Sequence, residues 1–168
     1  MGTVLIRMVP PVVVAVPMYV LWTKFGLTGG LSGLVLAYLG LTIPLNVWML
    51  SIFIKEIPFE LEEAAAIDGC SYMRILWGIV VPLIKPGISV TSVFTFRTAW
   101  NEFLLAIILS NRSTRTLPAA VSLMISDLGI NWGQIMAMAT IIAIPAFIVT
   151  FACSKNLITG MTAGAVKG

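Results

Sequence analysis

Long runs of apolar residues alternate with short polar segments along the whole chain. An α-helix rises about 1.5 Å per residue and the hydrocarbon layer of a bilayer is about 30 Å thick, so roughly 20 apolar residues can span it. Runs of that length cover approximately 4–22, 31–54, 87–109 and 134–157. Charged residues lie mostly between these runs. The pattern predicts an all-α fold, a polytopic transmembrane helix bundle of about four spans, forming one transmembrane domain over 1–168.

The connections between these runs differ in character. Residues 23–30 are short and rich in glycine, which predicts an antiparallel hairpin of the first two spans. Residues 110–133 mix polar groups with a short apolar piece at 119–125, which predicts an interfacial helix. Pro44 and Pro145 fall inside spans, where neighbouring membrane helices tolerate kinks.

The third run carries polar residues on one helical face. Helical spacing places together Thr91, Thr95, Thr98 and Glu102, with Arg97 and Asn101 beside them. An arginine at the centre of a membrane helix costs about 3 kcal/mol, so this face must meet protein or water. One interpretation is a translocation path bordered by Thr95, Thr98, Asn101 and Glu102. The other is that the polar side chains only hydrogen-bond to neighbouring helices.

The loop between the second and third runs, residues 55–86, predicts a helix-turn-helix. Residues 55–69 hold five of the seven acidic residues and read as an amphipathic helix. Pro58 suits its first turn, Gly69 can take the left-handed stop conformation, and Ser71 can cap a second helix. One stripe combines Ile57, Leu61, Ala64 and Ala65. This small-residue face fits a docking helix, although a helix lying along the membrane surface has the same pattern.

Basic residues indicate the orientation. With loop 55–86 in the cytoplasm, six basic residues lie inside: Arg7, Lys55, Arg74, Lys85, Lys155 and Lys167. Three lie outside: Lys24, Arg112 and Arg115. This distribution favours both termini in the cytoplasm, because basic residues concentrate on the cytoplasmic side.

Composition excludes several classes of protein. The chain is 59% hydrophobic and 10% charged, too apolar for a soluble globule of 168 residues. A net charge of +3 is too small and scattered for nucleic-acid binding. Histidine is absent, and Cys70 and Cys153 have no metal-ligand spacing and are expected to be reduced thiols. We therefore expect neither an enzyme nor a metal site nor a cofactor.

The loop also carries a recognisable motif. Glu63-Ala64-Ala65, Gly69, Ile79 and Pro82 resemble the EAA signature of ABC importer permeases, with Val81 in place of the usual leucine. Residues 57–69 and 164–168 resemble the carbohydrate-uptake, maltose-type branch of that family. Trp100-Asn101-Glu102-Phe103 and Trp132-Gly133 also fit the family, so the resemblance covers essentially the whole chain.

The resemblance implies a permease subunit of an ATP-driven, binding-protein-dependent importer in a prokaryotic cell membrane. Its implied partners are a cytoplasmic ABC ATPase dimer, a second permease subunit, an extracellular or periplasmic solute-binding protein and the lipid bilayer. ATP hydrolysis belongs to the separate ATPase, and no phosphate-binding loop occurs in this sequence. The implied ATPase-coupling residues are Glu62, Glu63, Ala64, Ala65, Asp68, Gly69, Ile79 and Pro82. Such permeases usually have six spans, so about two amino-terminal helices are expected to be missing.

Three other interpretations remain. A channel or secondary transporter subunit not driven by ATP would use the polar third run but would not need the acidic, alanine-rich loop helix. A membrane-embedded enzyme would have to rely on Arg97, Glu102 and Asp127. In a purely structural subunit, the loop would tether some other cytoplasmic protein.

Overall fold

The structure, a computed structural model, describes residues 10–126 and 129–165. Its longer helices are α2 (Pro11–Lys24), α3 (Leu31–Lys55), α4 (Phe59–Ile67), α7 (Lys85–Trp100) and α10 (Trp132–Ala165). Shorter helices are α5 (Tyr72–Ile75), the π-helix η2 (Leu76–Val80), α6 (Val81–Leu83), α8 (Leu104–Leu109), α9 (Leu117–Val121) and the 3-10 helix η3 (Ser122–Met124). Strands β1 (Ile125–Ser126) and β2 (Gly129–Ile130) form a two-residue antiparallel ladder. The predicted all-α class is confirmed.

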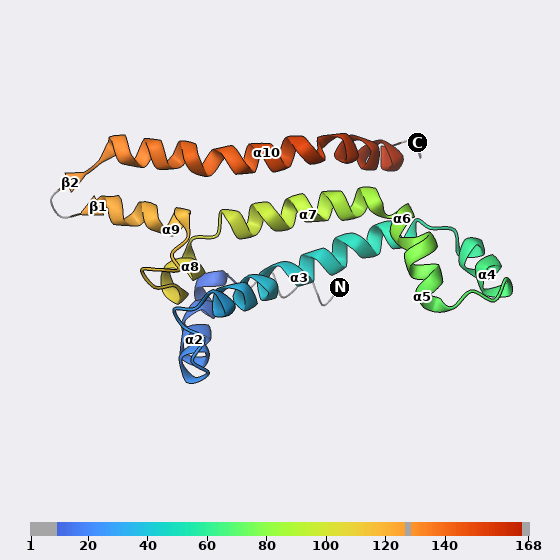
Figure 1. The fold of residues 1–168 in the computed structure, drawn as a ribbon, viewed down its shortest axis with the longest axis horizontal. Helices are drawn as coiled ribbons and strands as arrows, with labels where there is room; N and C mark the ends of the chain where they lie inside the picture. The colour runs from blue at the N-terminus through green and yellow to red at the C-terminus, as the bar shows by residue number, and fades with distance from the viewer. Residues whose placement is uncertain (1–9, 127–128, 166–168) are drawn as a thin grey trace.

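The three long helices α3, α7 and α10 lie side by side, with α7 in the middle (Figure 1). Loop 55–86 projects from one end of this layer, while α2, α8 and α9 gather at the opposite end (Figure 1). Helix α7 makes its main contacts with α10 and α3. Helix α7 is therefore the element that connects α3 with α10.

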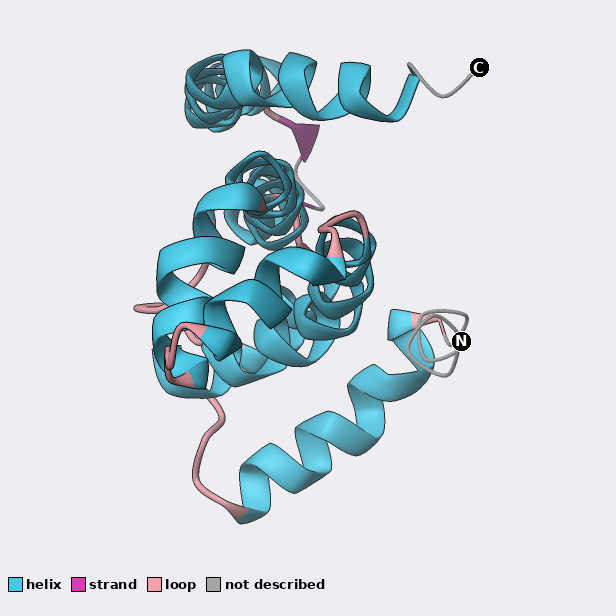
Figure 2. Cartoon of the chain, turned by 90° about the vertical axis from the view of Figure 1, so that its right-hand side faces the viewer, coloured by secondary structure: helices cyan, strands magenta, loops and turns pink. Residues whose placement is uncertain are grey.

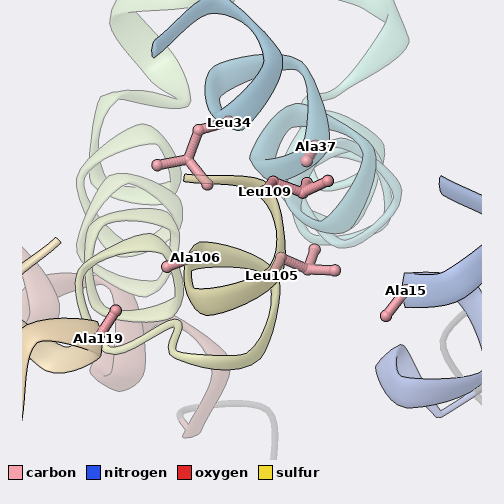
Figure 3. Close-up of a cluster of buried hydrophobic side chains, with 7 residues drawn as sticks. All are labelled: Ala15, Leu34, Ala37, Leu105, Ala106, Leu109 and Ala119. Carbon is pink, nitrogen blue, oxygen red and sulfur yellow. The ribbon is translucent and has the colours of Figure 1, made fainter. Parts of the chain in front are cut away.

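Two separate hydrophobic clusters lie in the structure, one at each end of the layer of long helices. The first cluster consists of Ala15, Leu34, Ala37, Leu105, Ala106, Leu109 and Ala119 (Figure 3). Four of its members are alanines, which let helix backbones approach closely. The second cluster consists of Ala65, Ile75, Val80 and Ile84 in loop 55–86. Each cluster is small because most other apolar side chains face outward.

That outward apolar surface matches a lipid environment. Helix α3 and the segment Trp132–Cys153 of α10 are each long and apolar enough to cross a membrane, and hardly any of either is buried within the chain. The bent pair Tyr72–Leu83 and Lys85–Trp100 meets the same test when taken together. Helix α2 is apolar but has only 14 residues. Exposed apolar surface on this scale is disfavoured in water.

The third predicted span, 87–109, is wrong as a continuous helix. Helix α7 begins at Lys85 and ends at Trp100, and α8 begins at Leu104. Polar side chains bond to the backbone on both sides of the break. The Asn101 side-chain amide donates to the Arg97 carbonyl at 2.9 Å, beside the Asn101 backbone N–H, and the Glu102 carboxylate accepts from the backbone N–H of Leu105.

The other predicted elements differ in smaller ways. Of the first predicted span, residues 4–9 lie outside the described residues, and the fourth predicted span begins two residues later than α10 does. The predicted interfacial segment 119–125 is helical only to Met124 and ends in β1. Helices α2 and α3 meet where the Trp22 indole N–H donates to the Gly33 carbonyl at 2.7 Å and where Ala15 shares the first cluster with Leu34, but α2 lies mainly against α8. Figure 2 shows α2, next to the N-terminal label, leaning away from the remaining helices.

Candidate coupling and translocation sites

Gly69 ends α4 with the left-handed turn that the sequence predicts. Its φ is 77°, the Gly69 N–H donates to the Ala66 carbonyl at 3.0 Å, and the Cys70 N–H donates to the Ala65 carbonyl at 3.0 Å. This pair of bonds is the Schellman motif, which satisfies the last carbonyls of a helix. The prediction for Gly69 is confirmed, and a glycine fits because a β-carbon disfavours this backbone conformation.

The predicted caps at the starts of the two loop helices are only partly correct. Pro58 stands immediately before α4, where its missing N–H costs nothing. Ser71 occupies the capping position of α5 with an extended backbone, but its side chain makes no capping hydrogen bond. The short helix α5 therefore depends on packing more than on its cap.

The helix in the second half of the loop has one wider turn, of the π type, before the chain continues into α7. The Val81 N–H donates to the Leu76 carbonyl, which makes η2 a π-turn with one extra residue. Pro82 follows directly and cannot donate a backbone hydrogen bond, so the wider turn accommodates it. At Ile84 the chain bends by 74° between Tyr72–Leu83 and Lys85–Trp100. The motif residues Ile79 and Pro82 therefore lie at the widened turn that precedes this bend.

The candidate coupling residues divide between the inside and the outside of the loop. Ala65 is 7% exposed in the second cluster, and Ile79 packs against that cluster. Gly69 is exposed, Glu62 is partly exposed, and the exposed polar and small side chains are Glu63, Ala64, Asp68 and Pro82. The predicted stripe is thus split, because Ala65 and Ile57 face the cluster while Leu61 and Ala64 face outward. One side of α4 packs against the second cluster, and the other side is exposed.

The second cluster connects α4 to both long helices. Leu50 and Phe53 of α3 pack against it, and so does Ile88 of α7. A β-carbon on Gly87 would lie 2.4 Å from the Phe53 ring, closer than real β-carbons approach other atoms. The first turn of α7 therefore packs directly against α3, and α4 shares the second cluster with both helices.

Several exposed apolar side chains of the loop were missed by the sequence analysis. Ile67, Tyr72 and Trp77 are 85%, 91% and 65% exposed. Large apolar side chains at this exposure are typical of a surface that another protein or a membrane covers. The available signal was the aromatic residues Tyr72 and Trp77 within a loop otherwise rich in charge.

The candidate translocation residues do not line one common cavity. Thr98 and Glu102 line a cavity of about 440 Å³ between α2, α3 and α8. Thr98 also borders a more open hollow with Asn101 and the exposed Arg97. Thr95 lines a third hollow, in which its hydroxyl lies 2.7 Å from Asn46 Oδ1 and 2.8 Å from the Thr91 carbonyl oxygen. Thr98 is the candidate that belongs to two of these cavities.

Glu102 also has a structural role. Both Glu102 carboxylate oxygens accept backbone hydrogen bonds, from Leu105 at 2.9 Å and from Ala106 at 3.0 Å. A carboxylate at the start of a helix also interacts favourably with the helix dipole. Glu102 therefore stabilises the start of α8 whether or not a solute passes beside it.

Trp100 joins α7 to α10 and was missed as a packing residue. Its indole Nε1–H donates to the Ile142 carbonyl at 2.9 Å, and its ring stacks on Phe96 with centroids 5.4 Å apart. Ile142 lies within the turn that precedes Pro145, so this bond holds α7 against α10 next to the proline.

Comparisons with known proteins cover nearly the whole chain. The family described as "Binding-protein-dependent transport system inner membrane component" matches residues 2–162. The diacetylchitobiose uptake system permease protein DasC of Streptomyces coelicolor is 34% identical over 99% of the chain and 61% of its own length. The trehalose/maltose transport system permease protein MalG of Thermococcus litoralis is 35% identical over 86% of the chain and 53% of its own length.

A third relative gives the same picture. The trehalose transport system permease protein SugB of Mycobacterium tuberculosis is 33% identical over 99% of the chain and 62% of its own length. The chain thus spans about three fifths of the length of such relatives. All three are named as permease proteins of uptake or transport systems. Together with the EAA motif of loop 55–86, the match over residues 2–162 shows that the chain belongs to the family of binding-protein-dependent transport system inner membrane components.

Proposed function

We propose that the chain is a permease subunit of an ATP-driven, binding-protein-dependent ABC importer for a sugar or a related solute. It forms part of the translocation path and contacts a cytoplasmic ABC ATPase dimer through loop 55–86. A second permease subunit and an extracellular or periplasmic solute-binding protein complete the transporter. The relatives named for diacetylchitobiose and for trehalose support a sugar as the solute. In this assignment both termini face the cytoplasm, and the chain itself holds no cofactor.

The observation that carries the proposal is the construction of loop 55–86. Helix α4 presents Glu63 and Ala64 outward while Ala65 anchors it to the second cluster. The same cluster includes contacts from Phe53 of α3 and Ile88 of α7. A partner that closes on the outer side of α4 therefore moves both long helices together. Packed side chains with few alternative arrangements transmit such a displacement well.

We infer that the translocation path runs beside Thr98. This residue borders both the cavity near Glu102 and the hollow near Asn101 and Arg97. Ionisable groups within membrane helices usually face water-filled or protein-lined routes, which supports this placement. Thr95 contributes from the adjoining hollow near Asn46.

The test replaces Gly69 with valine in the complete transporter. A β-branched residue at a φ of 77° costs at least about 1–2 kcal/mol, which lowers the equilibrium constant for the native turn by about tenfold. We expect ATP-dependent solute uptake to fall several-fold, while the ATPase subunits retain their basal hydrolysis. A β-carbon at this position would meet no neighbouring atom within 4 Å, so the effect comes mainly from the backbone conformation.

Two variants serve as controls for this test. Gly69→Asn should retain most of the uptake, because asparagine tolerates the left-handed conformation. Gly78→Val adds the same side chain to an equally open position of the same loop and should also retain it. Unchanged uptake by Gly69→Val would contradict coupling through the loop. Uptake that follows an ion gradient and survives ATP depletion would instead support a channel or secondary transporter.

A further inference from the structure

A separate cavity of about 470 Å³ lies between α3, the end of α7 and the start of α9. Figure 1 shows the start of α9 beside the end of α7. The polar residues of its lining are Tyr38, Arg115 and Thr116, and its apolar wall includes Phe96, Trp100 and Leu117. None of the candidate coupling or translocation residues lines it.

Two buried polar atoms of residues that line this cavity have no hydrogen-bond partner in the described part of the chain. They are Arg115 Nε and Thr116 Oγ1. The buried Tyr38 hydroxyl is not counted with them, because it faces the Glu102 carboxylate. Buried polar groups are nearly always paired in native proteins, because an unpaired one loses its hydration without compensation. Two such atoms on neighbouring residues of one lining indicate a place where a polar group from another molecule fits.

The chemistry of the lining indicates the kind of group. Arginine can only donate hydrogen bonds, and the hydroxyls of Thr116 and Tyr38 can both donate. Among the described residues that line the cavity, none is acidic. Glu102 does not line the cavity, but its carboxylate faces the Tyr38 hydroxyl and takes up that donor, so Arg115 and Thr116 are the donors left for a ligand. A site with donors and a positive charge suits an oxyanion, and the arginine fork matches a phosphate in particular.

The apolar part of the lining indicates where the oxyanion comes from. The stacked rings of Phe96 and Trp100 form one wall, and Leu117 adds to the apolar surface. Trp100 is the last residue of α7, so the cavity opens at the end of a helix of the membrane layer. Tryptophan at a helix end is typical of the membrane interface, where the lipid headgroups lie.

We propose that this cavity binds a phosphate-type oxyanion, supplied by the headgroup of a membrane phospholipid. The Arg115 guanidinium and the Thr116 hydroxyl hold the phosphate oxygens, and the acyl chains lie along the wall of Phe96 and Leu117. The proposal is independent of the transported solute, because the cavity is separate from the one that Thr98 and Glu102 line.

Lipid retention by the purified, delipidated transporter tests the site. Native mass spectrometry measures binding of dioleoylphosphatidylglycerol and of dioleoylglycerol, which lacks the phosphate, and inorganic phosphate alone is added as a competitor. We expect preferential binding of the phospholipid. Arg115→Gln should weaken that binding by about tenfold, and Thr116→Val should weaken it several-fold. The matched control is Arg112→Gln, which removes the same charge from an exposed position of the same segment and should change nothing.

Each outcome decides part of the proposal. Equal binding of the two lipids, or equal loss in the variants of Arg112 and Arg115, would overturn it. Inorganic phosphate that binds in an Arg115-dependent way, without any preference between the lipids, would support the oxyanion site and overturn the headgroup as its source. If Arg115→Gln does not assemble, Arg115→Lys keeps the charge and loses the fork, and it should still bind the phospholipid more weakly than the unchanged protein.

Discussion

Glu102 caps α8 and also borders the cavity that Thr98 lines, so one side chain has two possible roles. Removing the carboxylate leaves the backbone N–H groups of Leu105 and Ala106, both residues of the first cluster, without an acceptor. We expect Glu102→Ala to destabilise the protein by about 1–3 kcal/mol, since buried unpaired donors carry that cost. Thermal unfolding of the complex in detergent measures the loss, and Glu102→Gln, which keeps one acceptor oxygen, should lose less.

Thr98 is the matched comparison for the other role of Glu102. Thr98 borders the same cavity but caps no helix, so Thr98→Val should change solute uptake with little effect on unfolding. If Glu102→Ala lowers uptake while the unfolding temperature stays unchanged, its capping role would be refuted. The two variants together separate a residue of the path from a residue of the scaffold.

At the scale of secondary-structure elements, Gly87 lets the start of α7 pack closely against Phe53 of α3. A β-carbon on Gly87 would lie 2.4 Å from the ring of Phe53, so the ring must shift to admit even alanine. We expect Gly87→Ala to lower the free energy of unfolding by about 1–3 kcal/mol, the usual cost of overpacking, and to reduce ATP-dependent uptake. Uptake assays and thermal unfolding of the same preparations provide the measurement.

Two further variants identify the cause of that loss. Gly78→Ala adds the same methyl group where no atom lies within 4 Å, and it should leave stability unchanged or slightly higher. Combining Gly87→Ala with Phe53→Leu removes the ring that the methyl group would strike and should recover part of the loss. A wild-type unfolding temperature for Gly87→Ala alone would show that α3 and α7 are packed less tightly at Gly87 than the structure indicates.

The elements themselves could be predicted from the sequence to different extents. The apolar runs locate α3 and α10 because a membrane helix is defined by length and hydrophobicity. Gly69 was predictable because a left-handed turn favours one residue type. The break after Trp100 was not, since helical periodicity continues through Glu102 while the break depends on hydrogen bonds from side chains to the backbone. The position of α8 against α2 was also hidden, because alanine contacts such as Ala15 with the first cluster leave no periodic signal.

At the scale of the whole molecule, the polar side of α7 divides between several hollows rather than one channel. Thr98 borders two of them, Asn101 is exposed in one, and Thr95 is hydrogen-bonded within a third. A solute that passes along α7 therefore meets Thr98 and Thr95 in different hollows, one after the other. Accessibility of introduced cysteines to a water-soluble thiol reagent tests this arrangement. The background must lack Cys70 and Cys153, which are both free thiols.

We expect cysteine at position 98 to react fastest and to be protected by the transported solute, because its side chain borders two hollows. Position 101 should react as well, and position 95 should react more slowly, since the cysteine there sits beside Asn46. Ile148→Cys on α10 is the matched control, because it is exposed in the structure but should face lipid, where the thiol ionises poorly and the reagent is excluded. If positions 95, 98 and 101 all resist labelling, or if Ile148→Cys reacts as fast as position 98, α7 does not border the path and its polar face only packs the bundle.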